Sequence, residues 1–401
     1  MGNSHQDSVV DSVVIVAAKR TPMGGMQGAF TGVSAPELGA AAIAASLGDI
    51  KFDSAQIDEV YFGNVVSAGL GQAPARQASL GAGIPESVPC TTISKVCGSG
   101  MKAVMIARDQ IMAGNADIVM AGGMESMSNA PYLLPKARAG MRMGHAEVVD
   151  SLFFDGLQDA DTGGLMGSFG QATADQFGLT REGMDNYAIE SLRRATQAVD
   201  QGLMKDEITP VTVKTRKGEV VVSEDEQPGN AKPEKIPSLR PAFKKDGTVT
   251  AANASSMSDG AAALLLMRES TAQEKGLQPL ARIIGQASHA QAPSDFCIAP
   301  QGAMQKLLDK VDWKADEVDL YEINEAFAVV SMLAIDKFGL DPAKVNINGG
   351  ACALGHPLGA SGARLIVTLI HALKRTGKTK GVASLCIGGG EATAIAVEVM
   401  A

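Results

Sequence analysis

Three short stretches in the first third of the chain resemble three stretches near its end, in the same order. The pairs are VYFGN (60–64) with LYEIN (320–324), CGSGMKA (97–103) with GASGARL (359–365), and AGGMES (121–126) with IGGGEA (387–392). The separation within each pair is nearly constant, so the repeating unit is a whole domain rather than one turn of a solenoid. Chance similarity between glycine-rich turns is the alternative, but the preserved order favours two duplicated halves of one architecture.

The residues around the first set of motifs alternate between strand and helix patterns. Apolar, β-branched runs at 12–24, 58–66 and 116–127 predict strands, the last of them running into a glycine turn. Helical patterns that stop at glycine or proline lie between them, at 35–48 and 72–85. This order predicts an α/β fold with a mostly parallel sheet covered by helices.

The composition changes between the two halves. Residues 127–257 combine a Met-, Arg- and Pro-rich stretch without a clear strand, an amphipathic helix at 179–202 and a proline-rich loop at 224–241. We interpret this segment as an insertion, and long insertions with little regular structure often carry function. The expected organisation is a first half at 1–126 that is completed by 258–279, an inserted loop domain at 127–257, and a second half at 280–401.

Charge and cysteine content exclude several classes of protein. The net charge of −9 and the isoelectric point of about 5.2 argue against nucleic-acid binding. The basic segments at 214–219 and 242–247 could hold an anionic ligand, although a solvated basic surface is the simpler interpretation of each. The five cysteines are widely spaced without a CxxC pair, which indicates free thiols in a reducing compartment rather than a disulfide framework or a zinc site.

The sequence carries no pattern that directs it away from the cytoplasm. Residues 1–22 lack the basic and apolar regions of a secretory signal, and Gln6 breaks the myristoylation pattern. No apolar run reaches the length of a bilayer span. We therefore expect a soluble cytoplasmic protein without a membrane partner.

The first candidate for chemistry is Cys97, in the stretch SKVCGSG (94–100). It lies between a strand pattern and a helix pattern, at a Gly-Ser-Gly turn. This arrangement resembles a nucleophile elbow, and the unpaired N–H groups and the dipole of a helix N-terminus favour the thiolate. For this residue taken alone, a buried packing cysteine is an equally good interpretation.

Three further stretches supply candidates. His356 lies in a loop before a helix pattern, and the duplication should bring this helix start opposite that of Cys97, where the histidine could serve as its base. Cys386 ends an apolar strand at a Gly-Gly-Gly turn, either as core packing or as a second thiol for proton transfer beside turn N–H groups that could bind an oxyanion. The stretch YEINEAFAVV (321–330) contains a polar cluster, or a helix cap, made of Asn324, Glu325 and Phe327.

Together these stretches resemble one family. VCGSG (96–100), NEAFA (324–328), GGACALGHPLGASGAR (349–364) and CIGGGEATA (386–394), in this order and spacing, are similar to the motifs of the thiolases, most closely those of the biosynthetic type. The resemblance covers nearly the whole chain. It implies a thiolase fold, in which two duplicated βαβαβαββ halves pack in α/β/α/β/α layers and the first half carries an inserted loop domain.

The resemblance also implies roles for individual residues. Cys97 would carry an acetyl group as a thioester after activation by His356, and Cys386 would take a methyl proton from a second acetyl-CoA or protonate the leaving group in reverse. The N–H groups of Cys97 and Gly388 would form one oxyanion site, and His356 with a water held by Asn324 would form the other. The positions expected to contact coenzyme A are Ser255, Phe243, Ala326, Phe327, Met166 and Leu157.

Three positions depart from the biosynthetic pattern. Leu165 stands where a histidine usually precedes the methionine, Phe296 stands where the acyl pocket usually has methionine, and Pro228 stands where an arginine usually lies near the adenine. These changes concern the acyl-chain preference and the binding of the nucleotide. They leave the catalytic set unchanged.

The resemblance thus implies an acyltransferase of fatty acid metabolism that reversibly condenses two acetyl-CoA molecules to acetoacetyl-CoA and CoA. The alternatives are a degradative 3-ketoacyl-CoA thiolase for longer chains, which shares all four motifs, and a non-catalytic acyl-CoA carrier on the same scaffold. Retention of the whole catalytic set argues against the carrier. We expect no metal or redox cofactor, since thioester activation and oxyanion donors suffice, and a homo-oligomer, because the family forms dimers or tetramers.

Overall fold

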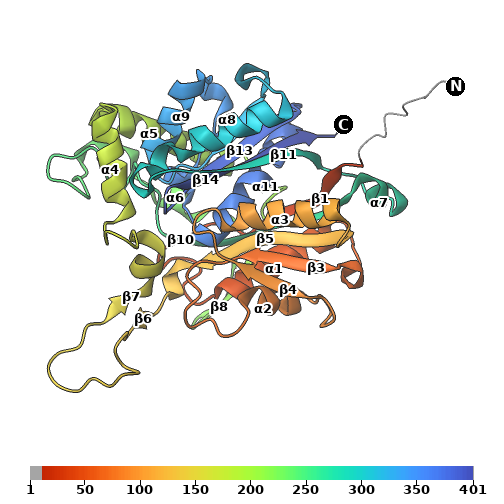
Figure 1. Cartoon of the computed structure of the whole chain (residues 1–401), viewed down its shortest axis with the longest axis horizontal. Coiled ribbons are helices and arrows are strands. Elements are labelled where there is room, and N and C mark those ends of the chain that lie inside the picture. Colours follow the sequence, from red (N-terminus) through yellow and green to blue (C-terminus); the bar gives the residue numbers. More distant parts are fainter. Residues whose placement is uncertain (1–10, 401) are drawn as a thin grey trace.

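A computed structural model describes residues 11–400, and Figure 1 shows their arrangement. The main sheet runs in the order β12-β13-β14-β11-β1-β10-β5-β3-β4, with the short β2 paired to β10. Its strands are β1 (Val13–Arg20), β2 (Gly24–Gly25), β3 (Glu59–Gly63), β4 (Cys90–Ile93), β5 (Ile118–Ser126), β10 (Ser258–Arg268), β11 (Ala281–Ala290), β12 (Leu320–Ile323), β13 (Lys380–Ile387) and β14 (Glu391–Val399).

The order of the strands repeats between the two halves of the chain. Strands β3, β5, β10 and β1 follow one another in the first half as β12, β13, β14 and β11 do in the second. The position of β4 is taken in the second half by a single parallel bridge between Tyr321 and Val345. Within the sheet of residues 11–400, the two halves pair where Val14 and Ile15 of β1 lie opposite Arg282 and Ala281 of β11. Two copies of one sheet architecture therefore make up the body of the molecule.

The sheet is mixed, and the prediction of a mostly parallel sheet is wrong. Pairs β3–β4, β3–β5 and β12–β13 are parallel, whereas β10 and β14 are antiparallel to both of their neighbours. The physical reason is the connection. A helical crossover returns the chain parallel, but β14 follows β13 through a tight turn, which reverses its direction.

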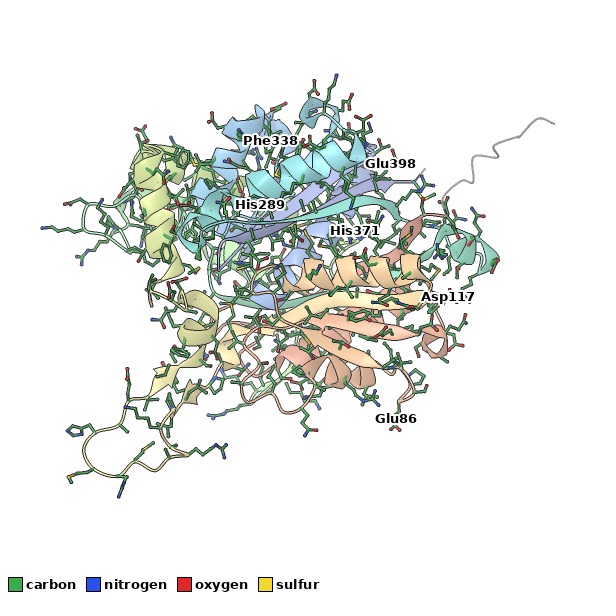
Figure 2. All side chains as sticks on the ribbon, in the orientation of Figure 1. Glu86, Asp117, His289, Phe338, His371 and Glu398 are labelled. Atoms are coloured by element: carbon green, nitrogen blue, oxygen red, sulfur yellow. The ribbon has the colours of Figure 1, made fainter. Side chains whose placement is uncertain are left out.

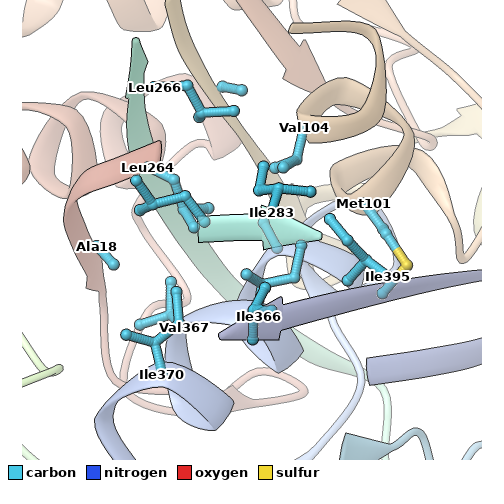
Figure 3. Packing of buried hydrophobic residues seen from close by; sticks show 14 of the residues in the cluster. Ala18, Met101, Val104, Leu264, Leu266, Ile283, Ile366, Val367, Ile370 and Ile395 are labelled. Carbon is cyan, nitrogen blue, oxygen red and sulfur yellow. The ribbon is translucent and has the colours of Figure 1, made fainter. Parts of the chain in front are cut away.

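The helices form layers around the two halves of the sheet. Apolar side chains of α1 and α2 pack on the outer face of the first half, and those of α8 and α9 pack on the second. Between the halves lie α3 and α11, whose apolar residues share one core with strands from both (Figure 3). The helices of the two halves are α1 (Ala35–Asp49), α2 (Pro74–Gly81), α3 (Ser99–Ala113), α7 (Glu269–Glu274), α8 (Ala299–Val311), α9 (Ala328–Phe338), α10 (Ala351–Leu354) and α11 (Leu358–Thr376).

Helix α11 is buried on every side over most of its length. A helix that is apolar all round belongs in an interior, and small residues let it approach α3 closely. A Cβ on Gly362 would lie 2.4 Å from the backbone N of Met101, and one on Gly100 would lie 2.9 Å from the backbone N of Ala363. At the far end of α11, His371 Nε2 donates a hydrogen bond to the carbonyl of Ala18 in β1 at 2.9 Å, and Figure 2 shows His371 between the halves.

The glycines of β5 do not form the predicted turn. The strand continues through Gly122 and Gly123. These positions require glycine because neighbouring backbone lies close: a Cβ on them would lie 2.1 Å from the carbonyl oxygen of Ala262 and 1.9 Å from that of Gly359. By contrast, the matching stretch IGGGEA holds the true turn between β13 and β14. The third motif pair of the sequence repeat therefore does not occupy equivalent positions, although the strands that carry it, β5 and β13, do.

The inserted segment, residues 127–257, packs beside both halves and projects a long loop between β6 and β7 (Figure 1). The predicted amphipathic helix is α5, but the expected proline-rich loop contains α6 and a 3-10 helix. Buried Arg20 of β1 anchors the inserted segment, because its guanidinium donates hydrogen bonds to Glu207 at 2.6 Å and to Asp225 at 2.7 Å. Its elements are β6 (Tyr132–Leu133), β7 (Val149–Asp150), a π-helix (Leu152–Leu157), α4 (Met166–Gln176), α5 (Arg181–Asp200), β8 (Val211–Thr215), β9 (Gly218–Val222), α6 (Glu226–Asn230) and the 3-10 helix (Pro233–Ser238).

Among the helices of residues 11–400, none combines the length and apolarity that a membrane crossing requires. The expectations about a secretory signal and myristoylation rest largely on residues 1–10, which lie outside the described residues.

Candidate active site

One cavity of about 210 Å³ lies between the inserted segment and the ends of the central helices. Nine of the residues predicted for the site line it: Cys97, His356, Gly388, Ser255, Phe243, Ala326, Phe327, Met166 and Leu157. Leu165 and Phe296, two of the positions that depart from the family pattern, line it as well. Pro228, the third, is buried in α6 and is not part of the wall.

Cys97 lies in a strained turn between β4 and α3. The residue before it, Val96, has φ of +46°, an unfavourable value for a β-branched side chain. Ser99 stabilises the turn, because its hydroxyl accepts from Lys95 N at 2.8 Å and donates to Val96 O at 2.6 Å. The turn directs the Cys97 thiol toward the second half, where its sulfur accepts a hydrogen bond from the backbone N–H of Gly388.

The Cys97 thiol is neutral near pH 7. Burial raises its pKa to about 11, against the opposite effect of the Gly388 N–H and of its own backbone N–H. Contrary to the prediction that a helix N-terminus favours the thiolate, desolvation of the charge outweighs the effect of the helix start. A base must take the proton as the sulfur reacts.

His356 is held in the form that such a base needs. Its Nδ1 lies 2.5 Å from the hydroxyl of Ser361, and that hydroxyl donates its own proton to Pro357 O at 2.8 Å. Ser361 can thus only accept from Nδ1–H, which leaves Nε2 unprotonated. Burial, followed by the charge of Arg364, lowers the pKa of His356 to about 3. The imidazole is neutral, and its free nitrogen faces the amide of Asn324 at 3.4 Å.

Asn324 is buried beside His356 and does not line the cavity. Within the described residues its Oδ1 accepts no hydrogen bond. The neighbouring Glu325 points the other way and accepts from Tyr187 and Ser191 of α5, from Asn346, and from the backbone N of Cys352. The polar cluster read from the sequence is therefore two structures: an amide beside the histidine, and a carboxylate that binds the inserted segment.

Cys386 lies near Cys97 but outside the lining of the cavity. It is fully buried in β13, in a cluster with Phe296 and Cys297, and is not among the residues that line the cavity. Burial, and then the proximity of Cys297 and Cys97, raises its pKa well above the ordinary value. Cys386 is thus a protonated thiol within electrostatic reach of Cys97.

Part of the cavity lining is aromatic. Phe327 packs edge-on against Phe243 and Phe296, with ring centroids 6.4 and 6.3 Å apart. Ser255 joins two segments of this lining, because it donates its N–H and its hydroxyl to the carbonyl of Ala326 at 2.9 and 3.0 Å. A mostly apolar cavity with a few polar groups at its edge can bind a narrow, flexible ligand.

Comparison with known proteins identifies the family. Residues 13–270 match the thiolase N-terminal domain, and residues 277–399 match the thiolase C-terminal domain. The chain belongs to the thiolase family. The predictions of the family and of the thiolase fold are thereby confirmed.

Individual thiolases match over nearly their whole length. The acetyl-CoA acetyltransferase of Pseudomonas aeruginosa is 49% identical over 388 residues, which cover 96% of this chain and 99% of that protein. The crystal structure of the Bacillus anthracis acetyl-CoA acetyltransferase superposes with a TM-score of 0.95 at 43% identity, covering 98% of this chain and 99% of that one. A thiolase from Ascaris suum, solved in complex with coenzyme A, has a TM-score of 0.92 at 44% identity, with 97% and 100% coverage.

Two residues of this thiolase site were missed by the sequence analysis. Ser361 sets the tautomer of His356, and its only signal is its position one turn into the helix that follows the histidine. Arg364 lowers the pKa of His356 from α11, where it pairs with Glu322 at 3.1 Å. An arginine in the mostly apolar first part of this helix was a signal in the sequence, because a buried charge needs a partner.

Proposed function

We propose that this thiolase catalyses the reversible Claisen condensation of two acetyl-CoA molecules to acetoacetyl-CoA and CoA. The observation that carries the proposal is the arrangement of Cys97 and His356 in one apolar cavity, with the N–H of Gly388 donating to the Cys97 sulfur. The names of the relatives, which are acetyl-CoA acetyltransferases, support the substrate. The alternative of a non-catalytic carrier leaves this arrangement without a purpose.

The protons of the reaction balance among three side chains. Cys97 attacks the thioester carbonyl while its proton passes to His356 Nε2, and the departing CoA sulfur takes a proton from Cys386. The Cys386 thiolate then removes a methyl proton from the second acetyl-CoA. The resulting carbanion attacks the acetyl group on Cys97, whose sulfur leaves and recovers the proton from His356. The N–H groups of Gly388 and Cys97 would stabilise one oxyanion, and His356 with a water held by Asn324 would stabilise the other.

The pantetheine arm would lie in the cavity along Ser255, Phe243, Ala326, Phe327, Met166 and Leu157. The Ascaris suum structure, which contains coenzyme A, supports a ligand of this type. Leu165 and Phe296 fill the acyl end with apolar volume, and a methylene group in such a pocket changes binding by about 1–3 kcal/mol. We therefore expect short acyl chains to be preferred, with graded tolerance beyond four carbons.

Two measurements test the proposal. Brief incubation with acetyl-CoA, acid quench and peptide mass spectrometry should place an acetyl group on Cys97. Acetylation elsewhere only, or none, contradicts the nucleophile and the enzyme together. Thiolysis of acetoacetyl-CoA should have a higher kcat/KM than thiolysis of an eight-carbon 3-ketoacyl-CoA. The reverse order supports the degradative alternative.

We also propose that the protein acts in the cytoplasm, in fatty acid metabolism, as a dimer or tetramer and without a metal or redox cofactor. Strand β6 and the loop that follows it support assembly, since Tyr132 of β6 is 68% exposed and Met143 of the loop is 97% exposed. Light scattering after size exclusion measures the mass, and a monomer refutes the assembly. Activity that survives extensive dialysis against a chelator supports the absence of a metal requirement.

A further inference from the structure

A carboxylate outside the cavity lies where the two central helices begin. Glu125, the next-to-last residue of β5, is fully buried, and four N–H donors surround it. Its Oε1 accepts from Asn64 Nδ2 at 2.8 Å and from Val66 N at 3.2 Å, and its Oε2 accepts from Val65 N at 3.0 Å and from Gly359 N at 2.8 Å. All of these donors are neutral.

The bond to Gly359 reaches the active site. Gly359 lies in the first turn of α11, three residues after His356, and between them Leu358 lines the cavity. This turn has no space to shift toward β5, because a Cβ on Gly359 would lie 2.6 Å from Met124 O. A carboxylate at a helix N-terminus is also favoured by the helix dipole. Glu125 therefore fixes the position of the start of α11, which directly follows the loop that holds His356.

The same carboxylate holds the adjoining wall. Val66, whose N–H it accepts, packs with Leu358 in a small apolar cluster against which Cys97 and Leu157 also pack. The start of α3 is close as well, since a Cβ on Gly63 would lie 2.7 Å from both Gly100 N and Gly359 O. A shift of the Glu125 carboxylate is therefore transmitted to both helix starts through packed backbone.

The duplication makes the arrangement more informative. Asn64 and Asn324 hold matching places in the two halves, each directly after the equivalent strand. In the second half the asparagine faces His356, whereas in the first half it faces Glu125. In the second half this asparagine therefore lies beside the proposed base, whereas in the first half it lies beside a buried carboxylate that accepts a hydrogen bond from α11.

We propose that Glu125 is a positioning residue of the thiolase reaction, which keeps His356 aligned with Cys97 by accepting the N–H groups of Gly359, Val65 and Val66. The inference rests on the proposed function, because it concerns the same site. Glu125 does not touch the cavity, so its loss should lower kcat and leave KM nearly unchanged. A displacement of reacting groups by about 1 Å can cost about 100-fold in rate.

The test compares Glu125→Gln with a matched control. Glutamine keeps the shape but turns an NH2 group toward N–H donors, so one or two of the four bonds are lost. The control is Asp319→Asn, because Asp319 also accepts backbone N–H groups, of Thr379 at 3.0 Å and Lys380 at 2.9 Å, but at the far end of β13. We expect kcat for acetoacetyl-CoA thiolysis to fall about 10- to 100-fold in Glu125→Gln, and to stay within about twofold in the control. Equal kcat values in the two variants, at equal loss of thermal stability, overturn the inference.

A second measurement uses the unchanged protein, in case the variant does not fold. Burial raises the pKa of Glu125 to about 7, whereas the pKa values of His356 and Cys97 are about 3 and about 11. The titratable groups whose charges Glu125 feels are Asp259 of β10, with a pKa of about 6, and Cys97; the segment after β3 and the start of α11 present only N–H groups. Protonation removes one acceptor site from the carboxylate.

The rate of Cys97 acetylation should therefore fall as the pH drops below about 7, and this bend should be absent from Glu125→Gln if it folds. A rate without a bend between pH 6 and 8 in the parent enzyme overturns the inference. Failure of the proposed function is distinct from both outcomes, since the parent enzyme would then show neither thiolysis nor acetylation of Cys97 at any pH.

Discussion

Replacing Ser361 by alanine removes the hydroxyl that accepts the Nδ1 proton of His356. In the parent protein that hydroxyl cannot donate to Nδ1, because its own proton is donated to Pro357 O. The variant leaves Nδ1–H buried without a partner. The proton then moves to Nε2, the nitrogen that faces the cavity, where it can donate toward the unpaired Oδ1 of Asn324 after the amide turns. In that tautomer His356 cannot take the proton of Cys97.

The cost of the unpaired N–H sets the magnitude. A buried donor without a partner costs about 1–3 kcal/mol, and 1.4 kcal/mol corresponds to a factor of about ten in an equilibrium. The tautomer with a free Nε2 should therefore become about 5- to 150-fold less populated. If only this tautomer is productive, the rate of Cys97 acetylation falls by the same factor. Substrate binding should change little, because Ser361 does not line the cavity.

The assay is single-turnover acetylation, followed by intact-protein mass spectrometry after acid quench. The matched control is Ser46→Ala, since Ser46 is also a buried helical serine that donates to the carbonyl four residues earlier, Ala42 O at 2.9 Å, but lies in α1 away from the cavity. Both variants should lose similar stability, and only Ser361→Ala should lose rate. An unchanged acetylation rate in Ser361→Ala refutes the assignment of Nε2 as the base.

Three further outcomes are expected. Alkylation of Cys97 by iodoacetamide in the free enzyme, followed on its own peptide, should accelerate about tenfold per pH unit from pH 7 to 10, since the pKa of about 11 leaves the thiol protonated throughout; a plateau near pH 7 would show a preformed thiolate. Cys386→Ser should still be acetylated at Cys97 but should exchange the methyl protons of acetyl-CoA with heavy water about 10²–10⁴-fold more slowly; exchange at the parent rate would make Cys386 a packing residue. Gly123→Ala should lower the free energy of unfolding, measured by denaturant titration, by the upper end of the about 1–3 kcal/mol typical of overpacking, because its Cβ would lie 1.9 Å from Gly359 O; an unchanged free energy of unfolding would mean that β5 and α11 can separate.

The sequence predicted the parts of the fold that depend on local pattern. The helix at 179–202 and the helix after Cys97 were found because their apolar spacing and stop signals are read within a few residues. Glycine was the least reliable signal. In IGGGEA it marked a turn, whereas Gly122 and Gly123 mark the close approach of β10 and α11, which only the folded chain brings near.

The sequence predicted which residues form the site better than it predicted their protonation. Motif order named Cys97, His356 and Gly388, which the structure brings together in one cavity. Their protonation depends on burial, so the sequence led to a helix-stabilised thiolate where desolvation leaves a thiol. Ser361 and Glu125 were missed because each acts through a hydrogen bond to a group that is identified only after folding.

Strand β10 has a consequence for the way the protein is made. It pairs along its length with β1 on one side and β5 on the other, although the whole inserted segment separates it from β5 in the chain. During synthesis, β1 and β5 therefore lack their shared neighbour β10 and keep unpaired edges until the ribosome has passed Arg268. Pairing of such distant segments is slow, and a fragment that stops before β10 lacks the strand that closes its own sheet. The first half therefore completes its sheet only after β10 has been made, long after Cys97.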